Sequence, residues 1–315
     1  MASPSETPGQ GLPGQRGCVL LTGAHGFTGQ YVRAELQAAG YRVVDAVSPI
    51  EAAKRAGAAH ADEVVLDITS LDDCRAAMQV VRPDYLIHLA AISFVQHADA
   101  EAFYRVNVIG TLNLLQALAD CGITPRRVLI ASSANVYGNA AEGVLAETQP
   151  PAPVNHYAMS KLAMEYLVRP WCERLPIVIT RPFNYTGIGQ APHFLVPKIV
   201  SHFQQKAARI ELGNLDVERD FSDVRTVARI YRDLLVADCA GETVNVCSGQ
   251  PYSLRGIIAM MEDIAGYTID VQVNPAFVRA NEVRTLLGST EKLHRLVGAS
   301  ASIALPDTLR WMAQA

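Results

Sequence analysis

The most restrictive feature of the sequence is a glycine-rich turn between a short apolar run and a helical pattern. Residues 18–22 read Cys-Val-Leu-Leu-Thr, and glycines follow at positions 23, 26 and 29. Apolar residues then recur at helical spacing from Tyr31 to Ala39. A strand, a glycine turn and a helix in this order let backbone N–H groups approach a pyrophosphate at a helix N-terminus. A tight turn without a ligand is the alternative interpretation.

Further strand-like runs follow, and helical patterns separate most of them. Strands that alternate with helices predict an α/β fold, a doubly wound parallel sheet of the Rossmann type. After Asn184 the pattern changes, which predicts a smaller, interleaved C-terminal substrate lobe. The remaining strands of the main sheet are expected at 41–47, 63–66, 85–90, 127–132, 176–180 and 243–247.

The chain divides unevenly on this interpretation. Residues 1–16 are rich in Ser, Pro, Gly and Gln, and we expect a disordered tail there rather than a secretory signal, because the segment has no apolar core. The dinucleotide-binding domain should cover 17–183 and about 221–248. The substrate lobe should cover 184–220 and 249–315.

Composition excludes several classes of function. The net charge is −4, which disfavours a nucleic-acid partner, and no apolar run approaches the length of a membrane span. The six cysteines are scattered without a Cys-x-x-Cys pair, which predicts reduced thiols in a cytoplasmic protein. The eight histidines have no metal-ligand spacing, so we expect no metal.

A carboxylate at the end of the second strand would bind the adenosine ribose and favour NAD over NADP. The nearest candidate is Asp45, about two residues before the expected position, and Lys54 and Arg55 come too late to mark a 2′-phosphate site. The preference between NADH and NADPH therefore stays open. Asp67 and Ile68 follow the third strand, where they would either meet the adenine or belong to a helix N-cap region.

Tyr157 and Lys161 stand four residues apart in a segment with a helical pattern. Residues i and i+4 share one helix face, so the two side chains should project together. A neighbouring cation favours the phenolate, and we expect it to lower the pKa of Tyr157 and prepare the phenol for acid or base catalysis. Taken alone, the same spacing would also suit a solvated helix.

Polar side chains follow the fourth and fifth expected strands, where α/β proteins bind their ligands. Ser132 and Ser133 end the fifth strand, and either hydroxyl could hold a substrate carbonyl oxygen while Tyr157 supplies its proton. Ser93 lies in the loop after the fourth strand and could reach a substrate. Asn107 lies within an apolar helix, where its amide needs partners, either structural or functional.

Several motifs occur together in one order along residues 17–315, and through them the sequence resembles the extended short-chain dehydrogenase/reductase family, also called the NAD-dependent epimerase/dehydratase family. The matching motifs are Gly23-x-x-Gly26-x-x-Gly29, His88-Leu-Ala-Ala91, Asn107, Ser132-Ser133-x-x-Val136-Tyr137-Gly138, Tyr157-x-x-x-Lys161 and Arg181-Pro-Phe-Asn184.

The resemblance implies an NAD(P)H cofactor and a role for each matching position. Ser133 would orient the substrate oxygen, Tyr157 would act as the acid or base, and Lys161 would hold the nicotinamide ribose. Asn184 would lie near the diphosphate of a sugar nucleotide. The residues expected at the cofactor are Gly23, Gly26, Phe27, Thr28, Gly29, Asp67, Ile68, Leu89, Ala90, Ala91, Asn107, Tyr157 and Lys161.

One departure from the family narrows the chemistry. Sugar-nucleotide 4,6-dehydratases of this family carry an acidic pair or a Ser-Glu pair where this chain has Ala134 and Asn135. Neither an alanine nor an amide can remove the C5 proton. The sequence therefore favours direct reduction of a carbonyl group, with Asn135 left as a substrate-binding candidate.

Motifs of the second half resemble the branch of the family that acts on GDP-4-keto-6-deoxymannose. They are the segments 213–221, 245–249 and 274–283. Lys198, Arg219 and Arg279 would suit a diphosphate and a ribose. Glu282 would either pair with guanine or ribose or only cap a loop.

The expected activity is NAD(P)H-dependent reduction of the C4 keto group of a GDP-linked 4-keto-6-deoxyhexose, to give GDP-D-rhamnose. The alternatives are the C4 epimer GDP-6-deoxy-D-talose, a nucleotide-sugar 4-epimerase with tightly held NAD, and a silent dinucleotide-binding regulatory subunit. As in the family, amphipathic helices near 102–119 and 157–171 would pair in a homodimer, although they could equally pack within one chain.

Overall fold

The computed structural model describes residues 16–54, 62–93, 99–139, 143–277, 285–299 and 302–315. Its main sheet is seven-stranded, with the order β11-β7-β5-β4-β1-β2-β3 and parallel pairing between all neighbours. The predicted doubly wound parallel sheet is therefore confirmed. The strands are β1 Cys18–Thr22, β2 Arg42–Val47, β3 Glu63–Val65, β4 Tyr85–His88, β5 Arg127–Ala131, β7 Ile177–Pro182 and β11 Thr243–Val246.

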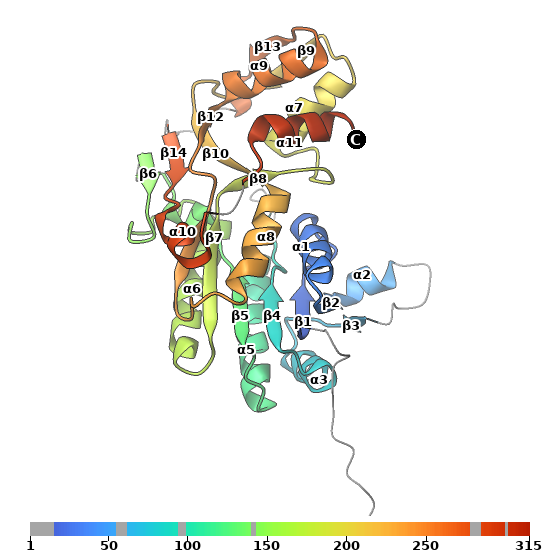
Figure 1. The fold of residues 1–315 in the computed structure, drawn as a ribbon, viewed down its shortest axis with the longest axis vertical. Helices are drawn as coiled ribbons and strands as arrows, with labels where there is room; N and C mark the ends of the chain where they lie inside the picture. The colour runs from blue at the N-terminus through green and yellow to red at the C-terminus, as the bar shows by residue number, and fades with distance from the viewer. Residues whose placement is uncertain (1–15, 55–61, 94–98, 140–142, 278–284, 300–301) are drawn as a thin grey trace, which may run out of the picture.

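Helices cover both faces of this sheet, and a separate apolar cluster fills each interface. One face carries α3 (Leu71–Val81), α5 (Gly110–Asp120) and α6 (His156–Val168). The other carries α1 (Phe27–Ala38) and α8 (Val224–Leu234), which lie side by side in Figure 1. Strands buried on both faces explain why the sequence reads as short, continuous apolar runs rather than as alternating patterns.

A smaller lobe lies beyond the carboxyl ends of the main strands, at the top of Figure 1. A third apolar cluster packs its three helices against its short strands. The lobe's helices are α7 Leu195–Gln204, α9 Leu254–Ala265 and α11 Leu305–Ala313. Its strands are β6 Gly143–Leu145, β8 Asn184–Thr186, β9 Arg209–Leu212, β10 Glu218–Asp223, β12 Pro251–Ser253, β13 Asp270–Val273 and β14 Thr285–Gly288.

We propose the domain division given by the sequence, with two exchanges between its parts. Strand β6 lies within 17–183 but pairs with β14 of the lobe. Helix α10 (Glu291–Val297) lies within 249–315 but packs on β11 of the main sheet. The expected disordered tail lies outside the described residues, except for Arg16, whose backbone N–H donates to Gly40 O at 3.1 Å.

The predicted helix over 102–119 is interrupted in the structure. It consists of α4 (Ala100–Tyr104), a π-helical segment Arg105–Ile109 and α5. Short elements elsewhere are α2 Pro49–Ala53 and the 3₁₀ segments Ala134–Tyr137, Arg169–Glu173 and Pro275–Phe277.

All six cysteines lie in the described part of the chain and are free thiols, as the sequence predicts. Among the helices of this part, none has the length and apolar character that a membrane span requires.

A chain of buried hydrogen bonds ties strands β1 and β4 to helix α5 and to the π-helical segment before it. The Thr22 hydroxyl accepts the N–H groups of Leu89 at 3.2 Å and Ala90 at 3.1 Å, which occupy both its lone pairs, so it donates to His88 Nδ1 at 2.8 Å. The Thr111 hydroxyl donates to Asn107 O at 2.8 Å, so it accepts His88 Nε2–H at 2.9 Å. Burial lowers the pKa of His88 to about 3, with Lys161 adding to the effect, which agrees with this neutral tautomer.

Replacing Thr111 with valine tests this direction of hydrogen bonding. Valine has a similar shape but leaves the His88 Nε2–H without its acceptor. We expect the free energy of unfolding to fall by about 1–3 kcal/mol, the cost of an unsatisfied buried donor. Chemical denaturation measures it, with Thr268→Val at an exposed position as the matched control. A Thr111→Val protein as stable as the wild type would contradict the assigned network.

Candidate active site

One continuous cavity of about 1610 Å³ runs along the carboxyl ends of the main strands and under the small lobe. It is lined from both parts of the chain, by the glycine turn on one side and by residues of α7, β9 and β10 on the other. A pocket for one drug-sized ligand measures about 300–1,000 Å³. This cavity is therefore large enough for two ligands, such as a dinucleotide and a sugar nucleotide.

The glycine turn packs so closely against neighbouring backbone that side chains at two of its glycines would clash. A Cβ on Gly23, whose φ is +70°, would lie 2.8 Å from Ala90 N, and one on Gly29 would lie 2.1 Å from Gly23 O. Helix α1 begins within this turn, so its free N–H groups face the cavity end. The residues present therefore fit a pyrophosphate. All the predicted cofactor residues except Asn107 line the cavity. Those that line it are Gly23, Gly26, Phe27, Thr28, Gly29, Asp67, Ile68, Leu89, Ala90, Ala91, Tyr157 and Lys161.

Asn107 lies behind the cavity wall and is 1% exposed. Its amide accepts the Ile92 N–H at 2.9 Å and donates to Ile92 O at 3.1 Å. It also donates to the Ser160 hydroxyl at 3.0 Å, and that hydroxyl donates to Tyr157 O at 2.8 Å. The sequence allowed either a structural or a functional role for Asn107. The structure favours the structural role, because Asn107 anchors the loop after β4 to the helix that carries Tyr157.

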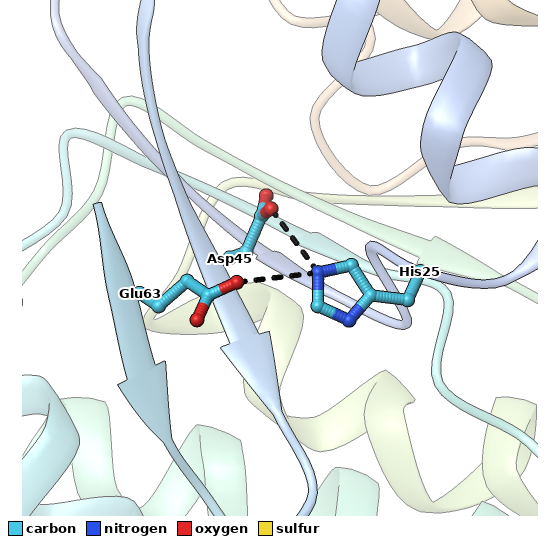
Figure 2. Close-up of side chains that lie close together, drawn as sticks. All are labelled: His25, Asp45 and Glu63. Atoms are coloured by element: carbon cyan, nitrogen blue, oxygen red, sulfur yellow. Dashed lines mark ion pairs between the residues drawn. The ribbon is translucent and has the colours of Figure 1, made fainter. Parts of the chain in front are cut away.

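Asp45 does not reach the cavity, which corrects it as a candidate for the ribose. Figure 2 shows the side chains of Asp45 and of Glu63 in β3 both turned toward the same ring nitrogen of His25, in the glycine turn. His25 Nε2 lies 3.5 Å from Asp45 Oδ2 and 3.4 Å from Glu63 Oε1. These three groups lie close enough to hold a cation, but Arg33 already donates to the same Asp45 oxygen at 2.8 Å. We therefore interpret the cluster as an anchor of the glycine turn.

Other residues occupy the end of β2 and β3. Ser48 and Glu51 line the cavity there and form a capping box at the start of α2. Asp67 also lines it, while one of its carboxylate oxygens accepts the Thr69 N–H at 2.9 Å. The Asp67 carboxylate therefore shapes the turn before α3 and also lines the cavity, and its contact with the adenine stays a prediction.

Ser133, Tyr157 and Lys161 meet at the centre of the cavity. Helix α6 begins after Asn155, whose side chain accepts the Ala158 N–H at 2.9 Å, and it places Tyr157 and Lys161 on one face. Ser133 follows β5, and its hydroxyl lowers the pKa of the Tyr157 phenol, which places the two side chains near each other. The Lys161 ammonium donates to Ala131 O at 2.7 Å. The three predicted catalytic side chains are thus brought together.

The pKa of Tyr157 differs from the expectation. Burial raises it to about 12, and the hydrogen bond from Ser133 opposes this shift without reversing it. Burial also lowers the pKa of Lys161 to about 8, against the Glu165 carboxylate, which raises it. Sequence reasoning counted the cation and missed the burial of both groups. A phenol that keeps its proton throughout the neutral range suits a proton donor.

Ser132 and Ser133 have different partners, which separates the two candidates. The Ser132 hydroxyl donates to Glu165 Oε1 at 2.6 Å and is committed to that bond. Glu165 in turn forms a buried, bidentate ion pair with Arg181, with bonds of 2.9 and 2.6 Å. The Arg181 guanidinium also donates to the Tyr137 hydroxyl at 3.0 Å. This network holds β5, β7 and α6 together, and it leaves Ser133 as the serine that faces the cavity centre.

The substrate-binding candidates fall into two groups. Ser93, Asn135, Asn184, Lys198 and Arg219 all line the cavity. Arg279 and Glu282 lie outside the described residues, so their predicted roles stay predictions. In the first group, the Lys198 ammonium donates to Glu211 O at 2.7 Å and stands 4.5 Å from the centre of the Phe277 ring.

Several aromatic residues of the cavity were not predicted, and Tyr185 and Phe277 are two of them. Tyr185 stacks on Phe27 with 5.9 Å between ring centres, and its hydroxyl lies 2.7 Å from the Thr28 hydroxyl. Tyr185 directly follows Asn184 of the last family motif, and this position in the sequence could have indicated that it lines the cavity. Phe277 lies in a short 3₁₀ segment without periodicity, so no comparable sequence signal marks it.

Comparison with known proteins decides the family. The model of the GDP-mannose 4,6 dehydratase family matches residues 20–312. The chain belongs to this family. The predicted class, an NAD(P)-dependent oxidoreductase of the short-chain dehydrogenase/reductase type, is confirmed.

Two relatives within this family act on GDP-linked 6-deoxyhexoses. GDP-6-deoxy-D-talose 4-dehydrogenase from Aggregatibacter actinomycetemcomitans is 38% identical over 75% of this chain and 80% of its own. GDP-6-deoxy-D-mannose reductase from Pseudomonas aeruginosa is 36% identical over 93% and 94%. The crystal structure of RMD from Pseudomonas aeruginosa in complex with NADPH superposes with a TM-score of 0.81, at 32% identity, over 95% of this chain and 98% of its own.

Proposed function

We propose that the protein reduces the C4 keto group of GDP-4-keto-6-deoxy-D-mannose with NAD(P)H and forms GDP-D-rhamnose. The observation that carries this proposal is the pair of hydroxyl groups at the cavity centre. Ser133 and Tyr157 line the same cavity, and Ser133 acts on the pKa of Tyr157. A carbonyl oxygen placed between them would meet one fixed donor and one proton source.

The acidic residues of the cavity follow strands that lie away from Ser133. Their position supports reduction rather than dehydration, although the family is named for a dehydratase. Within the described lining they are Glu51 and Asp67, which follow β2 and β3. Two strands, β1 and β4, separate β2 from β5, after which Ser133 stands. The positions next to Ser133 hold Ala134 and Asn135, which cannot take a carbon-bound proton.

The cofactor would lie along the glycine turn and the ends of β3 and β4. When bound, its reduced nicotinamide supplies the hydride. Gly23, Gly26 and Gly29 would leave room for the pyrophosphate, and Lys161 would hold the nicotinamide ribose while its charge favours the phenolate that remains after proton transfer. Tyr157 would donate its proton to the C4 oxygen, which is an alkoxide at that point and more basic than a phenolate.

The sugar nucleotide would lie under the small lobe. Asn184 and Arg219 would bind the diphosphate and ribose, which is supported by their presence in the cavity lining. Lys198 and Phe277 lie beyond them, where a planar base could lie against the ring. Ser93 and Asn135 flank the sugar end of the same space.

The talose-forming reaction is the second candidate, and the identity to the talose 4-dehydrogenase is the observation that favours it. The same three side chains serve both reactions, since the orientation of the sugar alone sets the face that is reduced. A 4-epimerase with tightly held NAD would use them as well. A silent regulatory subunit is disfavoured because Ser133, Tyr157 and Lys161 are all present and brought together.

Turnover with purified substrate tests the proposal. GDP-4-keto-6-deoxymannose is mixed with the protein and either NADH or NADPH, and loss of the absorbance of the reduced cofactor is followed. We expect oxidation of at least one cofactor, and the C4 coupling in the proton NMR spectrum then separates rhamnose from talose. A protein that oxidises neither cofactor contradicts the proposed function.

We also propose a cytoplasmic homodimer, as the family resemblance suggests. Ile109, Met159 and Tyr166 are exposed apolar side chains on the two helical segments expected to pair, which supports this assembly. Light scattering of the purified protein tests it, and a monomeric mass at micromolar concentration contradicts it.

A further inference from the structure

The hydrogen bonds around Ser133 fix more than its position. Its hydroxyl oxygen accepts the backbone N–H of Asn135 at 3.2 Å. It also accepts a side-chain N–H of the Asn135 amide at 3.0 Å. A hydroxyl oxygen has two lone pairs and one proton. Both lone pairs are therefore taken by the same residue, and Ser133 can take part in further hydrogen bonds only as a donor.

The remaining direction for the Ser133 proton is the cavity centre. Ser133 and Tyr157 both line the cavity, and because the Ser133 lone pairs are occupied its hydroxyl can act toward the phenol only as a donor. A donor at the phenol oxygen favours the phenolate, which agrees with the direction in which Ser133 acts on Tyr157. The Tyr157 proton is consequently not given to Ser133 and stays available for a substrate oxygen.

We propose that Asn135 is a positioning residue that sets the polarity of Ser133, so that the serine donates to the reacting oxygen and cannot accept the proton of Tyr157. This inference rests on the proposed function and replaces direct substrate binding as the role of Asn135. The residue acts through Ser133, and the two form one unit at the start of the 3₁₀ segment after β5.

The proposal explains why an amide stands at this position. An alanine would supply only its backbone N–H, and one lone pair of Ser133 would then be free to accept from the Tyr157 hydroxyl. An aspartate has the shape of asparagine but only accepts when ionised. It would draw the Ser133 proton toward itself and away from the substrate. Asn135 is exposed in the cavity, so these substitutions should leave the fold intact.

A double-mutant cycle tests the inference, with kcat and KM measured for the sugar nucleotide. Asn135→Ala should lower kcat by about 3- to 10-fold, the loss of one neutral hydrogen bond, and leave KM within about twofold. Ser133→Ala should lower kcat by about 10²-fold. In the Ser133→Ala background, Asn135→Ala should have no further effect, because its target is gone.

Asn135→Asp separates polarity from shape. If Asn135 only fills space, the aspartate variant should be at least as active as the alanine variant. If it sets the polarity of Ser133, the kcat of Asn135→Asp at pH 7.5 should be lower than that of Asn135→Ala by about threefold or more. Thermal unfolding of each variant, measured without ligands, checks that the fold is kept.

Three results would overturn the inference. They are an Asn135→Ala effect that persists in the Ser133→Ala background, an effect on KM alone, and an Asn135→Asp enzyme with the kcat of the wild type. The first two would return Asn135 to the role of a substrate ligand. The wild-type turnover is measured first, so a failure of the proposed function is recognised separately, as a wild-type protein without activity.

Discussion

Replacing Tyr157 with phenylalanine is expected to lower kcat by about 10²- to 10⁴-fold, the range for loss of a positioned general acid. The substitution removes one oxygen atom and keeps the ring that packs near Phe103. We propose the phenol as the proton source, because burial raises the pKa of Tyr157 to about 12 and the group keeps its proton in the neutral range. Stopped-flow or steady-state assays of cofactor oxidation measure the loss.

Two controls keep this result specific to Tyr157. Binding of NADPH, followed by fluorescence, should change little, since the removed hydroxyl is not part of the glycine turn. Tyr166→Phe alters an exposed phenol on the same helix and should retain the wild-type rate. A Tyr157→Phe enzyme with full kcat would remove the tyrosine from the mechanism and leave Ser133 or a water as the donor.

The second large effect is expected for Lys161→Met, which should lose most activity and change little in stability. We expect kcat/KM for the cofactor to fall by at least about 10²-fold, because both a ribose ligand and the charge that supports the phenolate are lost. The pKa of Lys161 is lowered from 10.5 to about 8 by burial. Holding the charge in the folded protein at pH 7 therefore costs about 3 kcal/mol.

The free-energy cost of the Lys161 charge depends on pH, and the lowered pKa of Lys161 sets the direction of this dependence. The cost is fully present below pH about 8 and disappears as the pH rises from about 8 through 10.5, where the unfolded chain also loses its proton. Methionine removes the cost but leaves Ala131 O without its donor, a penalty of about 1–3 kcal/mol. The two effects nearly offset each other.

The free energy of unfolding of the Lys161→Met variant should therefore lie within about 2 kcal/mol of the wild-type value at pH 7, while its activity is largely lost. Urea denaturation and cofactor kinetics measure the two sides. In the wild type, kcat/KM for the cofactor should decline as the pH rises through about 8, where free Lys161 loses its charge. A variant with wild-type kinetics, or one that is grossly unfolded, contradicts this account of the lysine.

The main sheet could be predicted because its strands are encoded locally. Each is a short apolar run that ends in a polar or glycine-rich turn, and β1 with the turn at Gly23 fixes where the sheet begins. The small lobe could not be predicted in the same detail. Its strands β6, β8, β12 and β14 have three or four residues and pair with partners far away in the sequence, such as Gly143 with Leu286.

The catalytic residues could be predicted as a set, whereas their electrostatics could not. Spacing identified Tyr157 and Lys161, but burial sets both pKa values, and burial depends on the tertiary packing. Spacing alone could not separate Ser132 from Ser133, because the decisive partner of Ser132 is Glu165 on another element. Asp45 was misplaced for a similar reason, since the direction of its side chain depends on His25 and Arg33.

The most direct test of the central claim is the position of the transferred hydride. The protein is incubated with GDP-4-keto-6-deoxymannose and NADPH that carries deuterium at both nicotinamide C4 positions, with deuterated NADH in parallel. The proposal predicts a GDP-6-deoxyhexose that is one mass unit heavier than the product made with unlabelled cofactor. The C4 proton signal should be absent from the NMR spectrum of this deuterated product. A product with protium at C4, or recovery of the keto sugar unchanged with both cofactors, would contradict reduction at C4.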